Sequence, residues 1–161
     1  MGLFDKLFGK KLEGIYAPIA GKAVAITEVP DPTFAEGMLG NGIAIEPADG
    51  KVYAPCDATV DMMFDTGHAV SLVAESGAEI LIHVGLETVG LEGKPFIVHV
   101  QNGDKVKKGQ LLIEADLEAI KAAGLPTITP VLICNTDNYP TFKTHVGTAV
   151  TNADLVIELG K

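Results

Sequence analysis

The sequence has only two cysteines, a shortage of basic residues and no long apolar run, and each of these features excludes a class of protein. Without a stretch of about 18 consecutive apolar residues, no membrane-spanning helix is expected. The 21 acidic residues outnumber the 12 basic ones, and the net charge of −9 argues against nucleic-acid binding because it repels phosphate backbones. Lysines interrupt the apolar residues near the start before a secretory signal could form, so the sequence predicts a cytosolic protein.

The sequence also lacks the common motifs of cofactor-binding and hydrolytic enzymes. The phosphate-binding loops GxGxxG and GxxxxGK[ST], the nucleophile elbow GxSxG and the zinc motif HExxH are all missing. Cys56 and Cys134 lie far apart and form no CxxC pair, which favours two ordinary core residues over a disulfide or a metal site. The corresponding classes of enzyme are therefore excluded, and no cofactor is expected.

Short runs rich in valine, isoleucine and alanine make up most of the chain. A composition of 47% hydrophobic and 20% charged residues supports a single folded domain, and the 18 glycines and 9 prolines lie between these runs. Such punctuation predicts an all-β protein, an antiparallel β-sandwich or partly closed barrel with very little helix. The expected strands are 15–20, 22–26, 42–45, 52–54, 70–74, 79–84, 96–100, 111–115, 129–133 and 155–159.

Two short helical segments are expected between the strands. The segment 117–123 has the pattern of a helix, because Asp116 can cap its N-terminus and Gly124 follows its C-terminus. Asp31 and Pro32 are expected to open a single helical turn, since proline is favoured at the first helical position. Helix therefore contributes little to the predicted fold.

The chain contains an internal repeat and a distinct N-terminal segment. Residues 15–24 (IYAPIAGKAV) are echoed 37 positions later by residues 52–60 (VYAPCDATV), which predicts a duplicated sheet motif. In residues 1–12 leucines and phenylalanines share one helical face and lysines another, the pattern of a short amphipathic helix or of a frayed tail. The expected organisation is a flexible or amphipathic segment over 1–14 and one domain over 15–161. An amphipathic helix would give residues 2–12 a peripheral membrane contact.

Two of the four histidines, His68 and His83, lie on neighbouring apolar segments joined by a short turn. If Ala74 pairs with Gly77 across that turn, His68 pairs directly with His83 and their Cβ atoms lie roughly 5 Å apart. A three-residue loop with a bulge at Gly77 would instead shift the pairing by one residue and place the two rings on opposite faces. The sequence favours the first register.

The first register creates a site with an imidazole pair and a hydroxyl group. Strand periodicity places Thr66 beside His68 and Leu81 beside His83. No third metal ligand and no partner for a hydrolytic triad is evident in the same strands, so Zn²⁺ would be held only incompletely and no metal is required. A histidine pair can accept a phosphoryl group, because one neutral imidazole attacks phosphorus while its neighbour donates hydrogen bonds to the phosphate oxygens.

Short motifs along most of the chain match one protein family in order and in spacing. They are Val29-Pro30-Asp31 with Phe34, GNGIA at 40–44, TGHA at 66–69, IHVGLETV at 82–89, GQ at 109–110 and TPV at 129–131. These motifs closely resemble the glucose-type IIA proteins of the bacterial phosphoenolpyruvate-dependent sugar phosphotransferase system. The resemblance covers nearly the whole chain from Ile15 onward, and it implies a duplicated antiparallel β-sandwich with a hybrid sheet motif of the lipoyl and biotinyl type.

The resemblance implies a function as a phosphoryl carrier. In this family one histidine accepts a phosphoryl group on Nε2 from the phosphocarrier protein HPr and passes it to a cysteine of the IIB domain of a membrane sugar permease. The HxGxxTV motif implies this role for His83, and the THA-type motif makes His68 the residue that stabilises the transferred phosphate. Thr66 would orient the histidine, and the carbonyl group of Gly85 would hold the Nδ1 proton of His83.

The resemblance also implies a docking surface for HPr and the IIB domain. In the family this surface is an apolar depression around the histidines, with an acidic rim that meets basic groups on HPr. Motif positions carry it over to Phe34, Met38, Leu39, Phe64, Leu81 and Val89, with Asp31 and Glu87 at the rim. The sequence departs from the family at Glu87, where aspartate is usual, at Val84, where phenylalanine is common, and at Pro32-Thr33, where apolar residues are usual.

Three other functions fit parts of the sequence. One is a regulatory binding protein that acts on other transporters or enzymes. A zinc endopeptidase of the LytM type needs an HxH pair with a further histidine and aspartate, whereas His83 is followed by Val84 and Gly85. A biotin or lipoate carrier would share the segments 52–55 and 102–110, but no lysine lies in the expected hairpin between residues 58 and 64.

Overall fold

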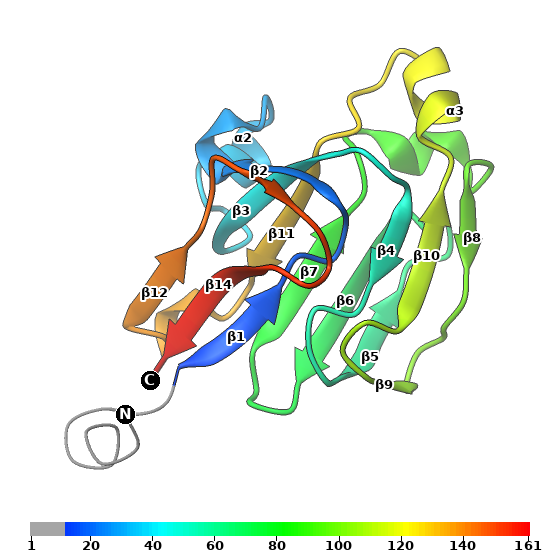
Figure 1. Ribbon diagram of the computed structural model, residues 1–161. Helices are drawn as coiled ribbons and strands as arrows, with labels where there is room; N and C mark the ends of the chain where they lie inside the picture. The colour runs from blue at the N-terminus through cyan, green and yellow to red at the C-terminus, as the bar shows by residue number, and fades with distance from the viewer. Residues whose placement is uncertain (1–11) are drawn as a thin grey trace.

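The strands of this protein form one large antiparallel sheet and two small ones (Figure 1). The structure is a computed structural model that describes residues 12–161. The large sheet contains, in order, β13 (Ala149–Val150), β2 (Gly21–Ala25), β3 (Asn41–Pro47), β11 (Thr129–Ile133), β7 (Glu79–His83), β6 (Ala69–Ala74), β5 (Ala58–Met63) and β9 (Lys105–Val106). One small sheet contains β1 (Glu13–Tyr16), β14 (Leu155–Gly160) and β12 (Thr141–Thr144), and the other contains β4 (Lys51–Tyr53), β10 (Leu111–Ala115) and β8 (Phe96–Val98).

Alternation of side chains gives each strand one face toward the core. Val70, Leu72 and Ala74 of β6 are buried on this face, as are Ile80 and Ile82 of β7. They join apolar side chains of β1, β14, β4 and β10 in one continuous core between the large sheet and the small ones. The predicted all-β antiparallel sandwich is thereby confirmed, and over the described residues the large sheet does not close into a barrel.

Helix is confined to short connections. The helical elements of the described residues are η1 (Ile26–Glu28), α2 (Pro32–Ala35), η2 (Thr88–Leu91), α3 (Leu117–Ala122) and η3 (Thr136–Asn138). Both predicted caps are present, because Asp31 accepts a hydrogen bond from the N–H of Thr33 and Asp116 accepts one from the N–H of Ala119. Within residues 12–161 no helix is long and apolar enough to cross a membrane.

Each of the expected strands has a counterpart, and 111–115 and 129–133 match to the residue. The strand expected at 15–20 ends earlier, at Tyr16, because the chain bends over 17–20 around Pro18. β1 also begins at Glu13, so the sheet includes two residues that the sequence places in the N-terminal segment 1–14. The amphipathic pattern of residues 1–11, and with it nearly all of the membrane segment 2–12, lies outside the described residues.

Four strands of the structure are not predicted from the sequence, and one cysteine predicted to be buried is exposed. β9 and β13 are too short to show alternation, and β12 has no buried residue. β5 contains a register shift between Val60 and Met62 that interrupts the period of two. Cys56 is buried as expected, but Cys134 is exposed in the loop that follows β11. Sequence periodicity therefore finds strands with regular alternation and misses those that are very short, lack a buried face or contain a bulge.

The internal repeat forms an approximate twofold arrangement. The N–H of Tyr16 in the first copy donates to the carbonyl of Pro55 in the second copy, at 3.0 Å. The N–H of Tyr53, the counterpart of Tyr16, donates to the carbonyl of Pro18, the counterpart of Pro55, at 2.7 Å. Because the two hydrogen bonds are reciprocal, the copies contact each other through the same backbone positions. The predicted duplicated sheet motif is therefore present in the fold.

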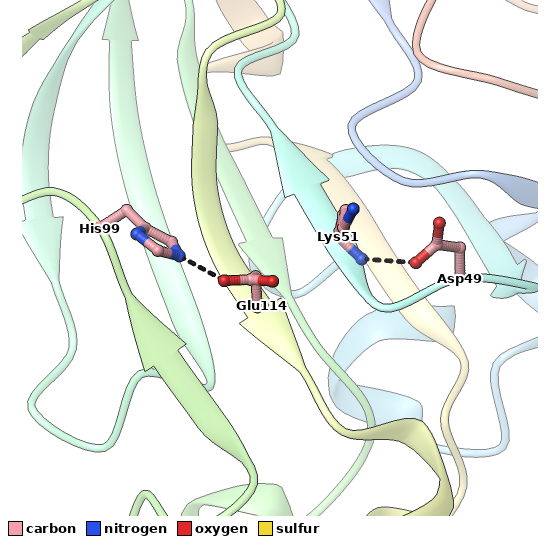
Figure 2. Close-up of polar contacts among 4 residues, drawn as sticks. All are labelled: Asp49, Lys51, His99 and Glu114. Carbon is pink, nitrogen blue, oxygen red and sulfur yellow. Dashed lines mark hydrogen bonds and ion pairs between the residues drawn. The ribbon is translucent and has the colours of Figure 1, made fainter.

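The two small sheets repeat the same polar contact. Nε2 of His99, just after β8, lies 2.7 Å from Oε2 of Glu114 on β10. Figure 2 shows this pair beside the turn that precedes β4. Nε2 of His145, just after β12, lies at the same distance of 2.7 Å from Oε2 of Glu158 on β14. Each pair joins an edge strand to the central strand of its sheet, so the duplication includes these two histidines.

The hairpin between β6 and β7 has the second of the two registers considered for it. Ala74 donates its N–H to the carbonyl of Ala78 at 2.8 Å, and the turn between them contains three residues. Gly77 ends this turn with φ of 97°, a conformation that glycine adopts without strain and that a bulged three-residue turn requires. The favoured register, with Ala74 opposite Gly77 and His68 opposite His83, is therefore wrong.

The two histidines nevertheless lie on the same side of the sheet. His83 is the last residue of β7 and is paired with Ala69, the first residue of β6. His68 precedes Ala69 in a bend, where the strand alternation that would send its ring to the other face does not apply. Gly67 has φ of 71° in this bend and donates its N–H to the carbonyl of Phe64 at 2.7 Å. A turn, and not direct cross-strand pairing, brings the histidines together.

Candidate functional site

Four aromatic rings lie in a row at one end of the large sheet. The ring centroid of His83 is 5.1 Å from that of Phe34 and 5.0 Å from that of His68, which in turn is 5.3 Å from Phe64. The interplanar angles of 57°, 78° and 70° are tilted or edge-to-face, which are the arrangements that aromatic rings prefer. The row joins α2, the end of β7 and the turn between β5 and β6, so three distant segments meet at this site.

The contact between His83 and Gly85 fixes the position of a proton. Nδ1 of His83 lies 2.7 Å from the carbonyl oxygen of Gly85. A carbonyl oxygen only accepts hydrogen bonds, so Nδ1 carries the proton and donates it. In the neutral ring the lone pair is then on Nε2, which makes no hydrogen bond to any residue of the described chain. His83 therefore presents an unprotonated nitrogen.

Both rings of the pair are neutral near pH 7. Burial lowers the pKa of His83 below its ordinary value, although the Gly85 carbonyl and the carboxylates of Asp31 and Glu87 oppose this shift. Burial lowers the pKa of His68 to about 4, and the neighbouring His83 adds to the effect. A low-dielectric site disfavours the charged imidazolium. The Nε2 lone pair of His83 is thus available for reaction at neutral pH.

Thr66 contacts His68 within the turn that precedes β6. The hydroxyl of Thr66 forms a hydrogen bond with Nδ1 of His68, and only 5% of His68 is exposed. The contact is as predicted, but the reason differs, because neither residue belongs to a strand and Gly67 makes the turn that joins them. When the hydroxyl donates to Nδ1, the proton of His68 is on Nε2, from which it can be donated to a ligand.

A shallow depression of about 330 Å³ surrounds the rings. Its lining consists of Asp31, Thr33, Phe34, Leu39, Phe64, His68, Leu81, His83, Glu87 and Val89. Every residue predicted for the docking surface is in this set except Met38, which is 70% exposed and lines a neighbouring hollow together with Leu39 and Cys134. Thr33 is the one lining residue that the sequence did not assign to the docking surface, because it stands where the family usually has an apolar residue.

The loop that follows β7 holds the carbonyl of Gly85. Gly85 has φ of 75°, and Glu87 is also left-handed with φ of 62°, so the chain folds back on itself. The hydroxyl of Thr88 donates to the carbonyl of Val84 at 2.6 Å, and both residues are fully buried. Val84 belongs to the main core, so its departure from the usual phenylalanine alters packing beneath the site and not the lining of the depression.

The other two histidines lie outside the depression, with Nε2 directed at the carboxylates of Glu114 and Glu158. Among the described residues, no group of three or more His, Cys, Asp or Glu side chains is arranged to hold a metal ion. Zinc endopeptidases need such a group, because a catalytic zinc normally has three protein ligands. The paired rings and the depression around them are thus the candidate site.

Comparisons with known proteins connect this site to one transport system. The sequence model of the family "phosphoenolpyruvate-dependent sugar phosphotransferase system, EIIA 1" matches residues 13–139. The glucose-specific EIIA component of Bacillus cereus is 48% identical over 153 residues, which cover 92% of this chain and 93% of that protein. The beta-glucoside-specific EIIBCA component of Bacillus subtilis is 50% identical over 127 residues, 79% of this chain and 21% of that longer protein.

A solved structure shows the same fold. The glucose permease IIA from Mycoplasma capricolum superposes with a TM-score of 0.87 at 32% sequence identity, and the match covers 92% of this chain and 96% of that one. With a two-layered antiparallel fold and a histidine pair in an open depression, these matches define a phosphoryl carrier that works through a phosphohistidine. The chain belongs to the EIIA 1 family of the phosphoenolpyruvate-dependent sugar phosphotransferase system. It is a phosphotransferase component of sugar transport.

Proposed function

We propose that His83 is the phosphoryl acceptor and that Nε2 is the atom that receives the group. The contact of 2.7 Å between Nδ1 and the Gly85 carbonyl supports this assignment most directly, because it leaves the lone pair on Nε2. His83 also lines the depression, whereas His99 and His145 direct Nε2 at a carboxylate elsewhere on the surface. His83 therefore combines a free nucleophilic nitrogen with access for a protein partner.

His68 stabilises the phosphoryl group during transfer. Its ring lies edge-to-face with that of His83, and Thr66 holds Nδ1, so the Nε2–H of His68 is available to the phosphate oxygens. His68 acts as a neutral donor because its burial lowers its pKa, so at neutral pH the ring carries one N–H and no charge. Donors placed beforehand at the developing charge need no reorganisation when the reaction occurs. His68 and Thr66 thus act on the transition state and do not accept the group.

The transfer consists of two displacements at phosphorus. In the first, the bond between Nε2 of His83 and phosphorus forms while the bond between phosphorus and the donor, phosphorylated HPr, breaks, and the leaving atom of HPr takes the electron pair. In the second, a cysteine thiolate of a IIB domain forms a bond to phosphorus while the bond to Nε2 breaks. Nδ1 of His83 keeps its proton throughout, so His83 needs no general base.

HPr and the IIB domain dock in turn on the depression. Its apolar centre is formed by Phe34, Leu39, Phe64, Leu81 and Val89, and Met38 extends it as an exposed side chain at the edge. Asp31 and Glu87 place two carboxylates at the rim, where they can pair with basic groups of a partner. The relative from Bacillus subtilis, named as an EIIBCA component, joins IIB, IIC and IIA in one chain, which supports the IIB domain of a sugar permease as the second partner.

Labelling from phosphorylated HPr tests the acceptor. His83→Gln should abolish incorporation, because glutamine retains polarity but has no nucleophilic ring nitrogen. His99→Gln is the matched control and should be labelled like the original protein, and mass spectrometry should place the phosphoryl group on His83. Label that persists in His83→Gln, or that maps to His99 or His145, would overturn the assignment.

The rate of transfer tests the role of His68. Loss of one donor placed at a transition state costs on the order of 3 kcal/mol, which is roughly a hundredfold in rate. His68→Ala should therefore be labelled at His83 but slowly, and it should pass the group to IIB slowly as well. If both rates equal those of the original protein, His68 has only a packing role.

A further inference from the structure

The carbonyl of Gly85 is held in place by a hydrogen bond on the other side of the same peptide unit. Gly85 C=O and Leu86 N–H belong to one planar trans peptide, in which the two groups point in opposite directions. The N–H of Leu86 donates to the carbonyl of Pro126 at 3.1 Å. This hydrogen bond therefore directs the Gly85 carbonyl away from Pro126 and toward Nδ1 of His83, which it reaches at 2.7 Å.

The preceding peptide unit is held by Thr88. Its carbonyl belongs to Val84, and the Thr88 hydroxyl donates to that carbonyl at 2.6 Å. Neither residue is exposed, so the carbonyl would otherwise lie in the core without a donor from solvent, a costly arrangement. Gly85 thus lies between two anchored peptide units, one held by the backbone of Pro126 and one by a side chain.

Packing around Gly85 leaves little freedom for the loop. A Cβ atom at this position would lie 2.7 Å from Cγ2 of Thr88 and 2.9 Å from the carbonyl oxygen of Pro126, both too close for contact. Thr88 thus contacts the loop twice, with its hydroxyl on Val84 and its methyl group against Gly85. The left-handed conformation of Glu87 turns the chain so that the hydroxyl can reach four residues back.

We propose that Thr88 is a positioning residue for phosphoryl transfer, whose buried hydroxyl orients the Gly85 peptide and thereby keeps the proton of His83 on Nδ1. The inference deepens the proposed function and rests on His83 as the acceptor. Thr88 lines no part of the depression and touches no reacting atom, so it acts only through Val84 and Gly85. Without its hydroxyl, the Val84–Gly85 peptide loses its anchor and the Gly85 carbonyl is held only through Leu86 and Pro126. The direction of the carbonyl is then less fixed, and the ring of His83 can place its proton on Nε2, where no lone pair is left for attack.

Nitrogen-15 NMR of the histidine side chains tests this directly, because it distinguishes a protonated ring nitrogen from a bare one. Thr88→Val keeps the shape and removes the donor, whereas Thr88→Ser keeps the donor and removes the methyl group. We expect one tautomer, with the proton on Nδ1 of His83, in the original protein and in Thr88→Ser, and a mixture in Thr88→Val. If the reactive tautomer falls to about a tenth, the rate of acceptance from phosphorylated HPr falls about tenfold.

Two further variants make the test decisive. Thr88→Ala also lacks the donor and is smaller, so it replaces Thr88→Val if valine prevents folding, and it should show the same mixture. Thr136→Val removes a hydroxyl that donates to the Ile133 carbonyl at the far end of β11, and it should leave the tautomer of His83 unchanged. An unchanged tautomer in the valine and alanine variants would overturn the proposal, and so would a mixture in Thr88→Ser. The tautomer is measured without phosphorus, so failure here is distinct from failure of His83→Gln to lose the label.

Discussion

At the scale of single residues, the burial of His68 links protonation to stability. The unfolded chain binds a proton at this histidine near pH 6.5, whereas the folded chain does so only near pH 4. As the pH falls between these values the unfolded state gains a proton that the folded state does not, so the free energy of unfolding decreases. The pKa of His83 is lowered in the same direction and adds to the effect. The protein should therefore be more stable at pH 7 than at pH 5.

Urea unfolding as a function of pH measures this effect. His68→Gln should flatten the decline between pH 6.5 and 5, an interval in which ordinary carboxyl groups titrate little. A slope that His68→Gln leaves unchanged would show that the buried ring does not control the acid sensitivity.

Glu87 combines a strained backbone with a position at the rim of the site. Its φ of 62° is unfavourable for a residue with a Cβ atom, at a cost on the order of 1 kcal/mol or more. Glu87→Gly should raise the free energy of unfolding by up to about 1 kcal/mol, because the strain is relieved. The larger backbone entropy that glycine loses on folding offsets part of this gain. The same change removes a rim carboxylate and should slow acceptance from phosphorylated HPr.

Glu92 provides a matched control for this prediction. It has a similar φ of 59° and does not line the depression. Glu92→Gly should therefore be stabilised in the same way, as measured by urea unfolding, while its rate of acceptance stays the same. Equal losses of rate in the two variants would contradict a specific role for the Glu87 carboxylate.

At the scale of elements, the parts of the fold that the sequence predicts are those with local causes. α3 is predicted because Asp116 caps it, and β10 and β11 are predicted because apolar residues mark them. The hairpin between β6 and β7 is also held by contacts with a distant residue. The side chain of Asn135 accepts from the N–H of Glu79 at 2.9 Å and donates to the carbonyl of Gly77 at 3.0 Å. Neither contact across 56 or 58 positions is visible in the sequence of the hairpin.

The same distinction applies to the site. The convergence of His68 and His83 follows from their motifs, although the bend at Gly67 that produces it does not follow from strand periodicity. The contact between Thr88 and Val84 depends on the left-handed backbone of residue 87, which a glutamate does not suggest. Motifs thus point to the groups that we propose to react, and the tertiary structure is needed to find what holds them.

Substitution of Asn135 tests its control of the hairpin. Asn135→Ala removes both hydrogen bonds to the turn and should lower the free energy of unfolding by about 1 to 3 kcal/mol. Asn135→Asp keeps the acceptor for Glu79 and loses the donor to Gly77, so its cost should be intermediate. Hydrogen exchange should quicken first at the turn 75–77 in both variants. Loss of stability without faster exchange there would indicate a different cause.

At the scale of the whole molecule, the acidic composition implies that the positive charge needed to bind the phosphoryl group comes from the partner. The sequence contains no arginine, and all 12 of its basic residues are lysines, so it has no guanidinium group to bind a phosphate in bidentate fashion. The net charge of −9 attracts a basic donor protein over long distances. Neutral donors at the site and cationic groups on the partner together can balance the transferred charge.

The rate of transfer should therefore depend on ionic strength. The second-order rate constant with phosphorylated HPr should fall about tenfold or more from low to high salt, as screening weakens the attraction. Asp31→Asn should reduce this dependence, and asparagine can still cap α2 in place of aspartate. Stopped-flow measurement across a salt series would show this, and a flat profile would contradict electrostatic steering.

The pairing of the first strand with the last has a consequence for how this domain can be linked to others. Glu13 of β1 lies opposite Leu159 of β14. In Figure 1 the start of β1 and the end of β14 lie close together at the lower left, whereas α2, which carries Phe34, lies near the top. A covalent tether therefore leaves the domain from one place whether it is attached before β1 or after β14. A circularly permuted chain, with its ends rejoined and a new opening in the turn at 101–104, should keep its histidines in place. The order of domains along a fused polypeptide can thus change without any change in the direction from which a partner reaches the site.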